Sequence, residues 1–221
     1  MAKTLQELES EIMDLKKQMA EYGRVKDLMD IWKLHSKYAH LYQMFKRSEI
    51  PNLFAQKTPG VTLEIEESGV YEGIEGVKKV FAGKFHENKV RPIPGFMAAH
   101  MVVNPIVEIN KDRTRAKGIW FSHGCVSLPL DDNKLTAAWC FGKYDMEYVK
   151  EDGEWKFLKL AYRGIYMTPY HKGWLEDPMP WSIRDVDSLD FWPDKPTTHH
   201  LPYHPRRINA FDVPPIPEPY E

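Results

Sequence analysis

The sequence predicts an α+β fold, with helices at the N-terminus and a long antiparallel sheet after them. Apolar residues follow helical spacing over the first 46 positions, whereas from residue 96 onward apolar stretches alternate with short turns rich in Asn, Asp and Gly. The last fifty residues contain ten of the 17 prolines, which disfavour helices and central strands. We therefore expect an N-terminal helix (1–23), an α+β domain (24–170) and an extended C-terminal arm (171–221).

Composition excludes several classes of function. Lys and Arg number 30 against 32 Asp and Glu, which gives a formal charge of −2 and no basic surface for nucleic acid or an anionic membrane. The sequence has no apolar run of about 18 residues, and its charged N-terminus lacks the apolar core of a signal peptide. Two cysteines, Cys125 and Cys140, are too few for a disulfide scaffold. We expect a cytoplasmic protein with free thiols and no nucleic-acid or membrane partner.

The first predicted helix, 4–22, carries a heptad pattern of apolar residues. Three heptads are marginal for a helix alone in water, so the apolar face packs either on its own domain or on a second subunit. Gly23 interrupts the pattern. We expect a homo-oligomer, a dimer or a trimer, held together by this helix and by the C-terminal arm. The heptad residues are Leu5, Leu8, Ile12, Leu15, Met19 and Tyr22.

The second predicted helix, 24–46, is amphipathic. Steps of 100° per residue place His35 and Tyr42 on the same side as its apolar residues. Tyr38, Tyr42 and His35 should therefore point inward, and a phenol there can hydrogen-bond without burying a charge. The apolar residues are Ile31, Leu34, Tyr38, Leu41 and Phe45, and Lys33, Lys37, His40 and Arg47 fall on the opposite side.

The middle of the chain predicts short elements and then four long strands. Pro51 is a favourable first residue for a short helix, and VTLEIEES (61–68) alternates as a strand. The segment GVYEGIEGVKKVFAGKF (69–85) reads as a turn followed by a helix, and KVRPIPG (89–95) as a loop. Strands at 97–109, 113–127, 135–149 and 155–167 follow, joined by turns of Asn, Asp and Gly, which predict an antiparallel meander with one face covered by the helices.

His100 lies among apolar residues in FMAAHMVVNPIVEI (96–109). It is either a core residue bonded to a backbone carbonyl or a group that takes and gives a proton. The turn near residue 111 pairs it with roughly residue 122 or 123, so His123 is a candidate cross-strand neighbour. Alternation separates His123 from Trp120, and the sequence leaves open which of the two faces inward.

The predicted arm combines its prolines with aromatic residues, which disordered tails lack. We expect it to wrap the domain or a neighbouring subunit. Its THHLPYH segment (198–204) offers metal ligands without a fixed spacing, and the chain has no Gly-rich phosphate loop, GxSxG or CxxC. We therefore expect neither a metal nor an organic cofactor. The aromatic residues are Trp174, Trp181, Phe191, Trp192, Tyr203 and Phe211.

The string GVYEGIEGVKKVF, with NLFA before it and an AAH strand after it, resembles the SnoaL-like branch of the nuclear transport factor 2-like superfamily. The resemblance covers roughly residues 25–168. It implies a cone: a curved antiparallel sheet wrapped against helices around a cavity. Similar proteins include scytalone dehydratase, bile acid 7α-dehydratase, polyketide cyclases, diarylpropane lyases and non-catalytic members.

The resemblance also implies positions for site residues. Tyr38 and His100 occupy the places of the tyrosine and histidine that transfer protons in the dehydratases, and His123 matches a second titratable group on the next strand. Arg163 has a place comparable to an arginine of the bile acid dehydratase. Gln43 stands where those enzymes usually carry an aspartate, a departure from the usual dehydratase pattern.

These observations predict a cofactor-independent lyase that acts on a small hydroxylated aromatic or polycyclic compound. His100 would be the general acid or base, Tyr38 and Tyr42 would orient an oxygen, and His123 would be a second proton carrier. Arg163 would hold a negative group, and His35, Trp120 and Tyr166 would contact the substrate. Gln43, which cannot titrate, favours the alternative of a non-catalytic ligand-binding or assembly protein. A structural subunit of an oxygenase is a third interpretation.

Overall fold

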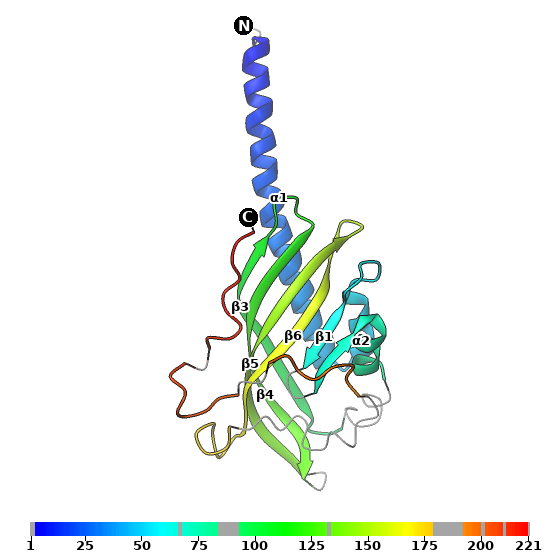
Figure 1. Ribbon diagram of the computed structural model, residues 1–221, viewed down its shortest axis with the longest axis vertical. Coiled ribbons are helices and arrows are strands. Elements are labelled where there is room, and N and C mark those ends of the chain that lie inside the picture. The colour runs from blue at the N-terminus through cyan, green and yellow to red at the C-terminus, as the bar shows by residue number, and fades with distance from the viewer. Residues whose placement is uncertain are drawn as a thin grey trace.

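The computed structural model describes residues 3–65, 68–83, 93–131, 134–178, 192–199, 202–209 and 211–220, with the backbone alone at 128–131 and 134. Figure 1 shows a curved sheet with a long helix behind it. The elements are α1 (Leu5–Gln43), η1 (Arg47–Leu53), β1 (Thr62–Ile65), β2 (Gly69–Glu72), α2 (Gly73–Phe81), β3 (Met97–Ile109), β4 (Arg115–Asp131), β5 (Lys134–Glu151) and β6 (Glu154–Pro169).

The six strands form one sheet in the order β2-β1-β6-β5-β4-β3. Strands β3 to β6 are consecutive antiparallel neighbours, as the turn residues predicted, while β1 pairs with β6 in parallel. The α+β architecture is thus confirmed. The prediction of a turn at 69–72 is wrong, because this segment pairs with β1 and its Val70 also exchanges backbone hydrogen bonds with Lys195 of the arm.

The first 43 residues contain one helix, so the predicted break at Gly23 is wrong. Thr4 and Glu7 form a capping box at its start. Gly23 is buried where the Arg113 side chain crosses the helix, and an added Cβ would lie 2.1 Å from Arg113 Nη1. A glycine inside a helix costs about 1 kcal/mol, and here its missing side chain makes room for that guanidinium.

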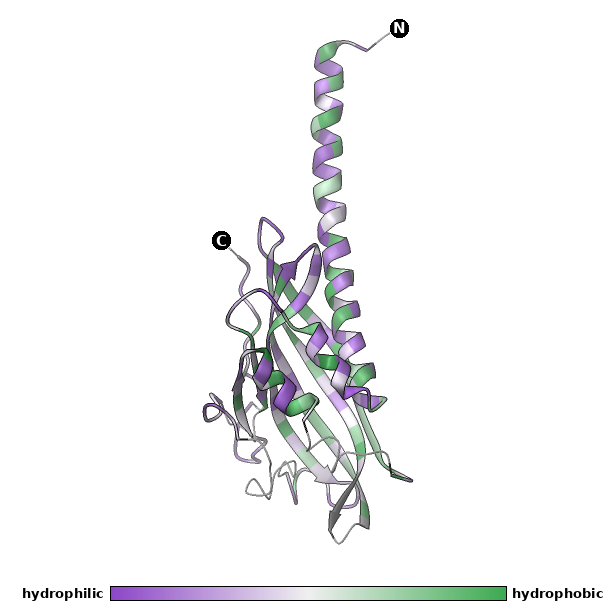
Figure 2. Cartoon of the chain, turned by 90° about the vertical axis from the view of Figure 1, so that its right-hand side faces the viewer, coloured by the Kyte–Doolittle hydropathy of each residue, from purple (hydrophilic) through white to green (hydrophobic). Residues whose placement is uncertain are grey.

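The helix has two different halves. Residues 5–22 project beyond the sheet and are exposed (Figure 1), and green hydrophobic residues alternate with purple hydrophilic residues along this part in Figure 2. The second half packs on one face of the sheet, which we call the inner face. Within the described residues, no helix is both long enough and apolar enough to cross a membrane.

The core between α1 and the inner face is rich in aromatic rings around His35. This histidine has no exposed surface and touches the rings of Tyr38, Trp120, Tyr144 and Phe157 at centroid distances of 4.7–5.9 Å. Neither ring nitrogen has a hydrogen-bond partner among the described residues. Burial lowers the pKa of His35 to about 3, so the native protein holds this imidazole neutral.

The arm crosses the other face of the sheet, which we call the outer face (Figure 1). The Tyr203 amide donates to the Ile165 carbonyl at 2.6 Å. Lys143 Nζ donates to the carbonyls of Phe211 (2.5 Å) and Pro214 (3.0 Å). The described parts of the arm therefore pack on the protein's own sheet, whereas Trp181 and Phe191 lie outside the described residues.

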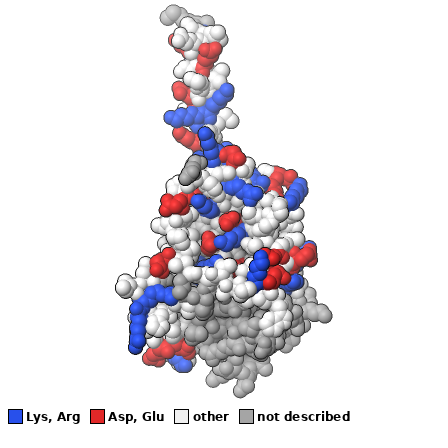
Figure 3. Space-filling view, in the orientation of Figure 1, with Lys and Arg blue, Asp and Glu red and all other residues white. Residues whose placement is uncertain are grey.

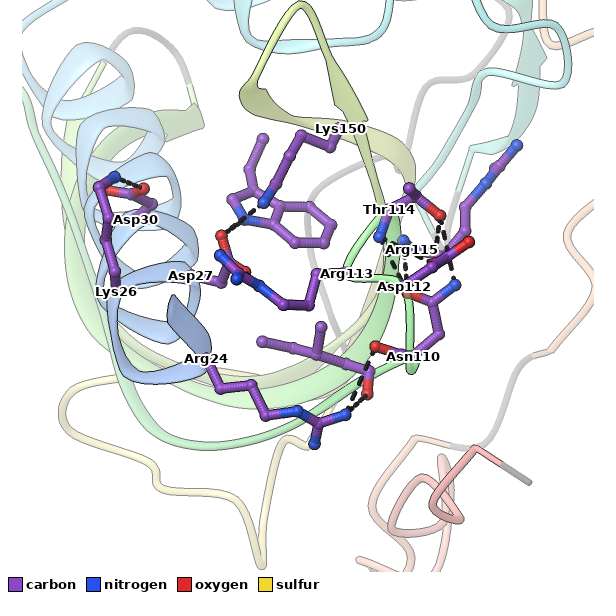
Figure 4. Close-up of polar contacts among 12 residues, drawn as sticks. Arg24, Lys26, Asp27, Asp30, Asn110, Asp112, Arg113, Thr114, Arg115 and Lys150 are labelled. Atoms are coloured by element: carbon purple, nitrogen blue, oxygen red, sulfur yellow. Dashed lines mark hydrogen bonds and ion pairs between the residues drawn. The ribbon is translucent and has the colours of Figure 1, made fainter. Parts of the chain in front are cut away.

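One buried carboxylate joins the middle of α1 to the ends of the sheet (Figure 4). Asp27 is 2% exposed and pairs with Arg113 Nε at 2.5 Å and Lys150 Nζ at 2.6 Å, while Trp155 Nε1 donates to it at 3.0 Å. Burial would raise the pKa of Asp27, but the donors from Arg113, Lys150 and Trp155 outweigh burial and lower it. The three partners come from the β3–β4 turn, the end of β5 and the start of β6.

Replacing Asp27 should loosen the helix from the sheet. Asp27→Ala leaves Lys150 and the Trp155 indole without their acceptor, so the free energy of unfolding in urea should fall by roughly 3 kcal/mol. Asp30→Ala is the matched control on the same helix, because its pair with Lys26 is exposed and should contribute less than about 0.5 kcal/mol. Equal effects of the two substitutions would show that the buried network does not hold the helix.

The enclosed His35 should make stability depend on pH. The unfolded chain takes up a proton on this imidazole as the pH falls below about 6.5, whereas the native pKa is about 3. Stability should therefore be complete above that range and fall as the pH drops from 6 to 4, with His35 contributing up to about 1.4 kcal/mol per pH unit.

His35→Leu should flatten this dependence by about that slope, measured by urea unfolding at pH 4, 5 and 6. His40→Leu, an exposed position on the same helix, is the control and should leave the slope as it is. A His35→Leu slope equal to that of the wild type would contradict a neutral buried His35.

Candidate functional site

The strand register brings His100 and Cys140 together on the inner face. His100 lies opposite Gly124 of β4, and Gly124 lies opposite Cys140 of β5. Because Gly124 has no side chain, His100 Nδ1 and Cys140 Sγ approach to 3.8 Å across it. An added Cβ there would lie 2.1 Å from the Ala99 carbonyl oxygen and 2.9 Å from Cys140 Sγ, so the contact depends on this glycine.

The end of α1 lies over this pair. The Tyr42 ring meets the His100 ring edge to face, with centroids 5.3 Å apart. Gln43 Nε2 donates to the His100 carbonyl oxygen at 2.6 Å. The helix therefore fixes the backbone of β3 at the histidine and places a phenol beside the imidazole.

Further tyrosine side chains lie on the inner face, in a series that leads away from His100. The ring centroids of Tyr38 and Tyr144 are 5.9 Å apart, and those of Tyr144 and Tyr162 are 5.2 Å apart. Gly142 keeps space for Tyr162, because an added Cβ would lie 2.7 Å from its hydroxyl oxygen. Tyr144 was not among the predicted site residues, although the alternation of β5 with Tyr144 and Met146 on one face could have identified it.

Arg47 is the last member of the cluster. Helical spacing in the sequence had placed it on the opposite side of the helix. That assignment is wrong, because α1 ends at Gln43 and Phe45 adopts a positive φ of 59°, which turns the chain back. Arg47 is 3% exposed. Its guanidinium carbon lies 4.0 Å from the centre of the Tyr42 ring, and Nε donates to the Tyr42 carbonyl at 3.4 Å.

The cluster is electrically neutral except for Arg47. Burial, and then the nearby charge of Arg47, lowers the pKa of His100 to about 4, so the imidazole is neutral at pH 7. Burial raises the pKa of the Cys140 thiol to about 12, which excludes a thiolate nucleophile at neutral pH. Burial also raises the pKa of Tyr38 and of Tyr144, so these phenols remain protonated hydrogen-bonding groups.

His123 lies on the outer face, so its predicted contact with His100 is wrong. The register pairs His123 with Met101 rather than with His100, and adjacent residues of a strand point to opposite faces. The register beside the turn, Ile109 with Ala116, would put His100 opposite Cys125, and the shift between Val103 and Ile106 puts it opposite Gly124. His123 instead contacts the rings of Trp139 and Phe141, while Trp120 faces inward.

Arg163 and Tyr166 also lie on the outer face, away from His100. Arg163 Nη1 pairs with Glu64 Oε1 at 2.6 Å, and Glu64 also accepts hydrogen bonds from Thr197 and Thr198 of the arm. Burial would raise the pKa of Glu64, but Arg163 and Thr198 lower it to about 2. Arg163 thus has an internal carboxylate as its partner, and Tyr166 stacks on Phe141 and Trp174.

His35 and Trp120 face the inner side but lie beneath the cluster. Both are enclosed, and Trp120 Nε1 donates to the Tyr148 hydroxyl at 2.7 Å. In this conformation they support the site rather than line it. Of the predicted site residues, the structure therefore brings together His100, Tyr38 and Tyr42, with Cys140, Tyr144 and Arg47 as additions.

A metal site is not formed by the residues that the structure describes, since no three His, Cys, Asp or Glu side chains among them are grouped to hold an ion. The THHLPYH segment is described only in part, because residues 200 and 201 lie outside the described ranges. The inner-face cluster can accept a proton at a neutral imidazole, donate hydrogen bonds from phenols and hold a negative group at Arg47.

Comparison with known proteins agrees with this architecture. The SnoaL-like domain family matches residues 23–161, whereas a comparison with curated proteins gave no match. The hexachlorocyclohexane dehydrochlorinase LinA-type3 from Novosphingobium barchaimii is similar in structure, with a TM-score of 0.55 and 21% identity over 72% of this chain and 99% of that one. A candidate scytalone dehydratase from Novosphingobium aromaticivorans has a TM-score of 0.54 and 18% identity over 71% of this chain and 95% of that one.

At these identities the two structures show a common fold and do not transfer an activity. The six-stranded curved sheet packed on an N-terminal helix is the cone fold that the resemblance implied, and the family match spans more than half of the chain. The chain therefore belongs to the SnoaL-like domain family, within the nuclear transport factor 2-like superfamily.

Proposed function

We propose that this protein is a lyase that removes water or another small fragment from a hydroxylated aromatic or polycyclic compound by acid–base chemistry. The observation that carries the proposal is the neutral His100 imidazole, held on the inner face among phenols and beside a buried guanidinium. The names of the two similar structures support the same class, because dehydratases and dehydrochlorinases both catalyse eliminations.

The geometry suggests how the groups would divide the reaction. In the tautomer that carries its proton on Nδ1, facing the Cys140 sulfur, His100 has Nε2 free to accept a proton from a carbon atom of the substrate. The electron pair of the broken C–H bond forms the double bond as the leaving oxygen departs. That oxygen takes a proton from the imidazolium or from a phenol, for which Tyr38 and Tyr42 are the candidates.

A turnover screen tests this proposal. Purified protein is mixed with hydroxylated aromatic and steroid-like ketones in EDTA, and mass spectrometry detects loss of water or of a one-carbon fragment. His100→Ala should lower turnover by roughly 10²–10⁴-fold, since one positioned proton-transfer group contributes about that factor. His123→Ala is the matched control on the outer face and should keep its activity.

Unchanged turnover in His100→Ala, with the fold intact by circular dichroism, would remove His100 from the mechanism. Loss of all turnover in EDTA would contradict chemistry without a metal. Saturable binding of several compounds without turnover would favour a second candidate, a ligand-binding protein. Gln43 favours that candidate, because it places a neutral amide beside His100 where the related dehydratases carry a carboxylate.

We further propose that residues 5–22 of α1 associate with a second copy of the chain. Their apolar side chains are exposed, and the heptad pattern suits a coiled coil. With Leu5 at position a, Glu11 and Lys16 fall at the flanking g and e positions, where opposite charges attract across a parallel pair. Figure 3 shows acidic and basic side chains intermixed along this projection.

Charges placed in the apolar face should separate the copies. Sedimentation should give an oligomer for the wild type and a monomer for the double variant Ile12→Asp, Leu15→Asp, because each carboxylate would be desolvated in the pair. Asp14→Ala, on the outward side of the same turn, should leave the mass as in the wild type. The helix proposal fails if the double variant has the wild-type mass.

A further inference from the structure

The inner face holds a buried cation for which the described part of the chain supplies no acidic partner. Asp27, Glu64, Lys143, Glu151 and Arg163 are also buried and charged, and each has an ion pair or at least two hydrogen bonds. Arg47 differs, because its Nη1 is buried with no hydrogen-bond partner. A buried charge without a partner is costly, so its retention calls for an explanation.

The local structure accounts for only some of the contacts that the Arg47 guanidinium could make. Lys46 N bonds to the Leu41 carbonyl across the turn at Phe45, which leaves the Tyr42 carbonyl at the helix end to accept from Arg47 Nε. The face of the guanidinium rests on the Tyr42 ring. Neither contact uses Nη1, so after helix capping and ring stacking this donor still has no acceptor.

We propose that Arg47 binds a carboxylate of the substrate beside His100, which narrows the substrate class to aromatic acids. This inference rests on the function proposed above and deepens it. A guanidinium suits a carboxylate because its planar donors match the two oxygens. Arg163 cannot serve this purpose on the inner face, since it faces outward and its Nη1 pairs with Glu64.

The position of Arg47 connects binding to chemistry. The Tyr42 ring contacts both the guanidinium, at 4.0 Å, and the His100 ring, at 5.3 Å. A carboxylate held at Arg47 thus lies one side chain away from the imidazole. Because the charge of Arg47 helps to lower the pKa of His100, neutralising that charge strengthens the base as the substrate arrives.

Matched acids and amides test the proposal by calorimetry. The probes are benzoate, phenylacetate and 4-hydroxyphenylacetate, each with its neutral amide. At least one acid should bind the wild type about tenfold more tightly than its amide, which corresponds to about 1.4 kcal/mol. Arg47→Met should remove this preference while leaving amide affinity unchanged, and Arg47→Lys should keep part of it. Arg206→Met, an exposed arginine of the arm, is the control and should behave as the wild type.

Equal affinity for acids and amides in the wild type would overturn the proposal, as would an acid preference that survives in Arg47→Met. Absence of acid binding up to about 10 mM would overturn it too. His100→Ala separates it from the lyase proposal. Acid preference that persists in His100→Ala, with no turnover of any compound in the screen, retains the anion site and removes the lyase. Turnover of a screened compound that needs His100, with equal affinity for acids and amides, retains the lyase and removes the anion site.

Discussion

The buried carboxylate of Asp27 fixes α1 over the sheet, and the geometry of the inner face depends on that position. The helix contributes Tyr38 and Tyr42, while the strands contribute His100, Cys140 and Tyr144, so every distance between the two sets varies with the placement of the helix. Asp27 holds one point through Arg113, Lys150 and Trp155. Gln43, roughly 24 Å further along the helix, holds the other through the His100 carbonyl. A helix fixed at both points keeps its phenols in register with the imidazole.

The two faces of the sheet have different electrostatics. On the outer face, Arg163 and Lys143 bond to Glu64 and to carbonyls of the arm, so the described charges there have internal partners. On the inner face, burial keeps an imidazole, a thiol and several phenols neutral, and Arg47 carries the charge. Paired charges stabilise a fold, whereas neutral groups with one available cation can receive a proton and an anion. This difference is why we assign the chemistry to the inner face.

The sequence predicts this fold well where the signals are local. Alternating strands and turns of Asn, Asp and Gly predicted β3 to β6, and helical spacing placed Tyr38 and Tyr42 inward. The errors occur where distant residues decide the outcome. The helix continues through Gly23, whose missing side chain leaves room for Arg113, and β2 pairs with the arm as well as with β1. His123 faces outward because Trp120 packs inward on His35, and Arg47 points inward because of the turn at Phe45. Alternation along a strand shows which residues share a face but not which face points inward. No local pattern could therefore have predicted which way His123 and Arg47 point.

The state of the His100 imidazole tests the account most directly. Its ring nitrogens can be followed by NMR during an acid titration of the native protein, with the signals assigned by their loss in His100→Gln. We expect a pKa near 4, so that the ring stays neutral through pH 5 to 8 and can act as a base. A pKa at or above the ordinary value of about 6.5 would show that His100 is solvated or paired with an acid, and it would contradict a neutral base on the inner face.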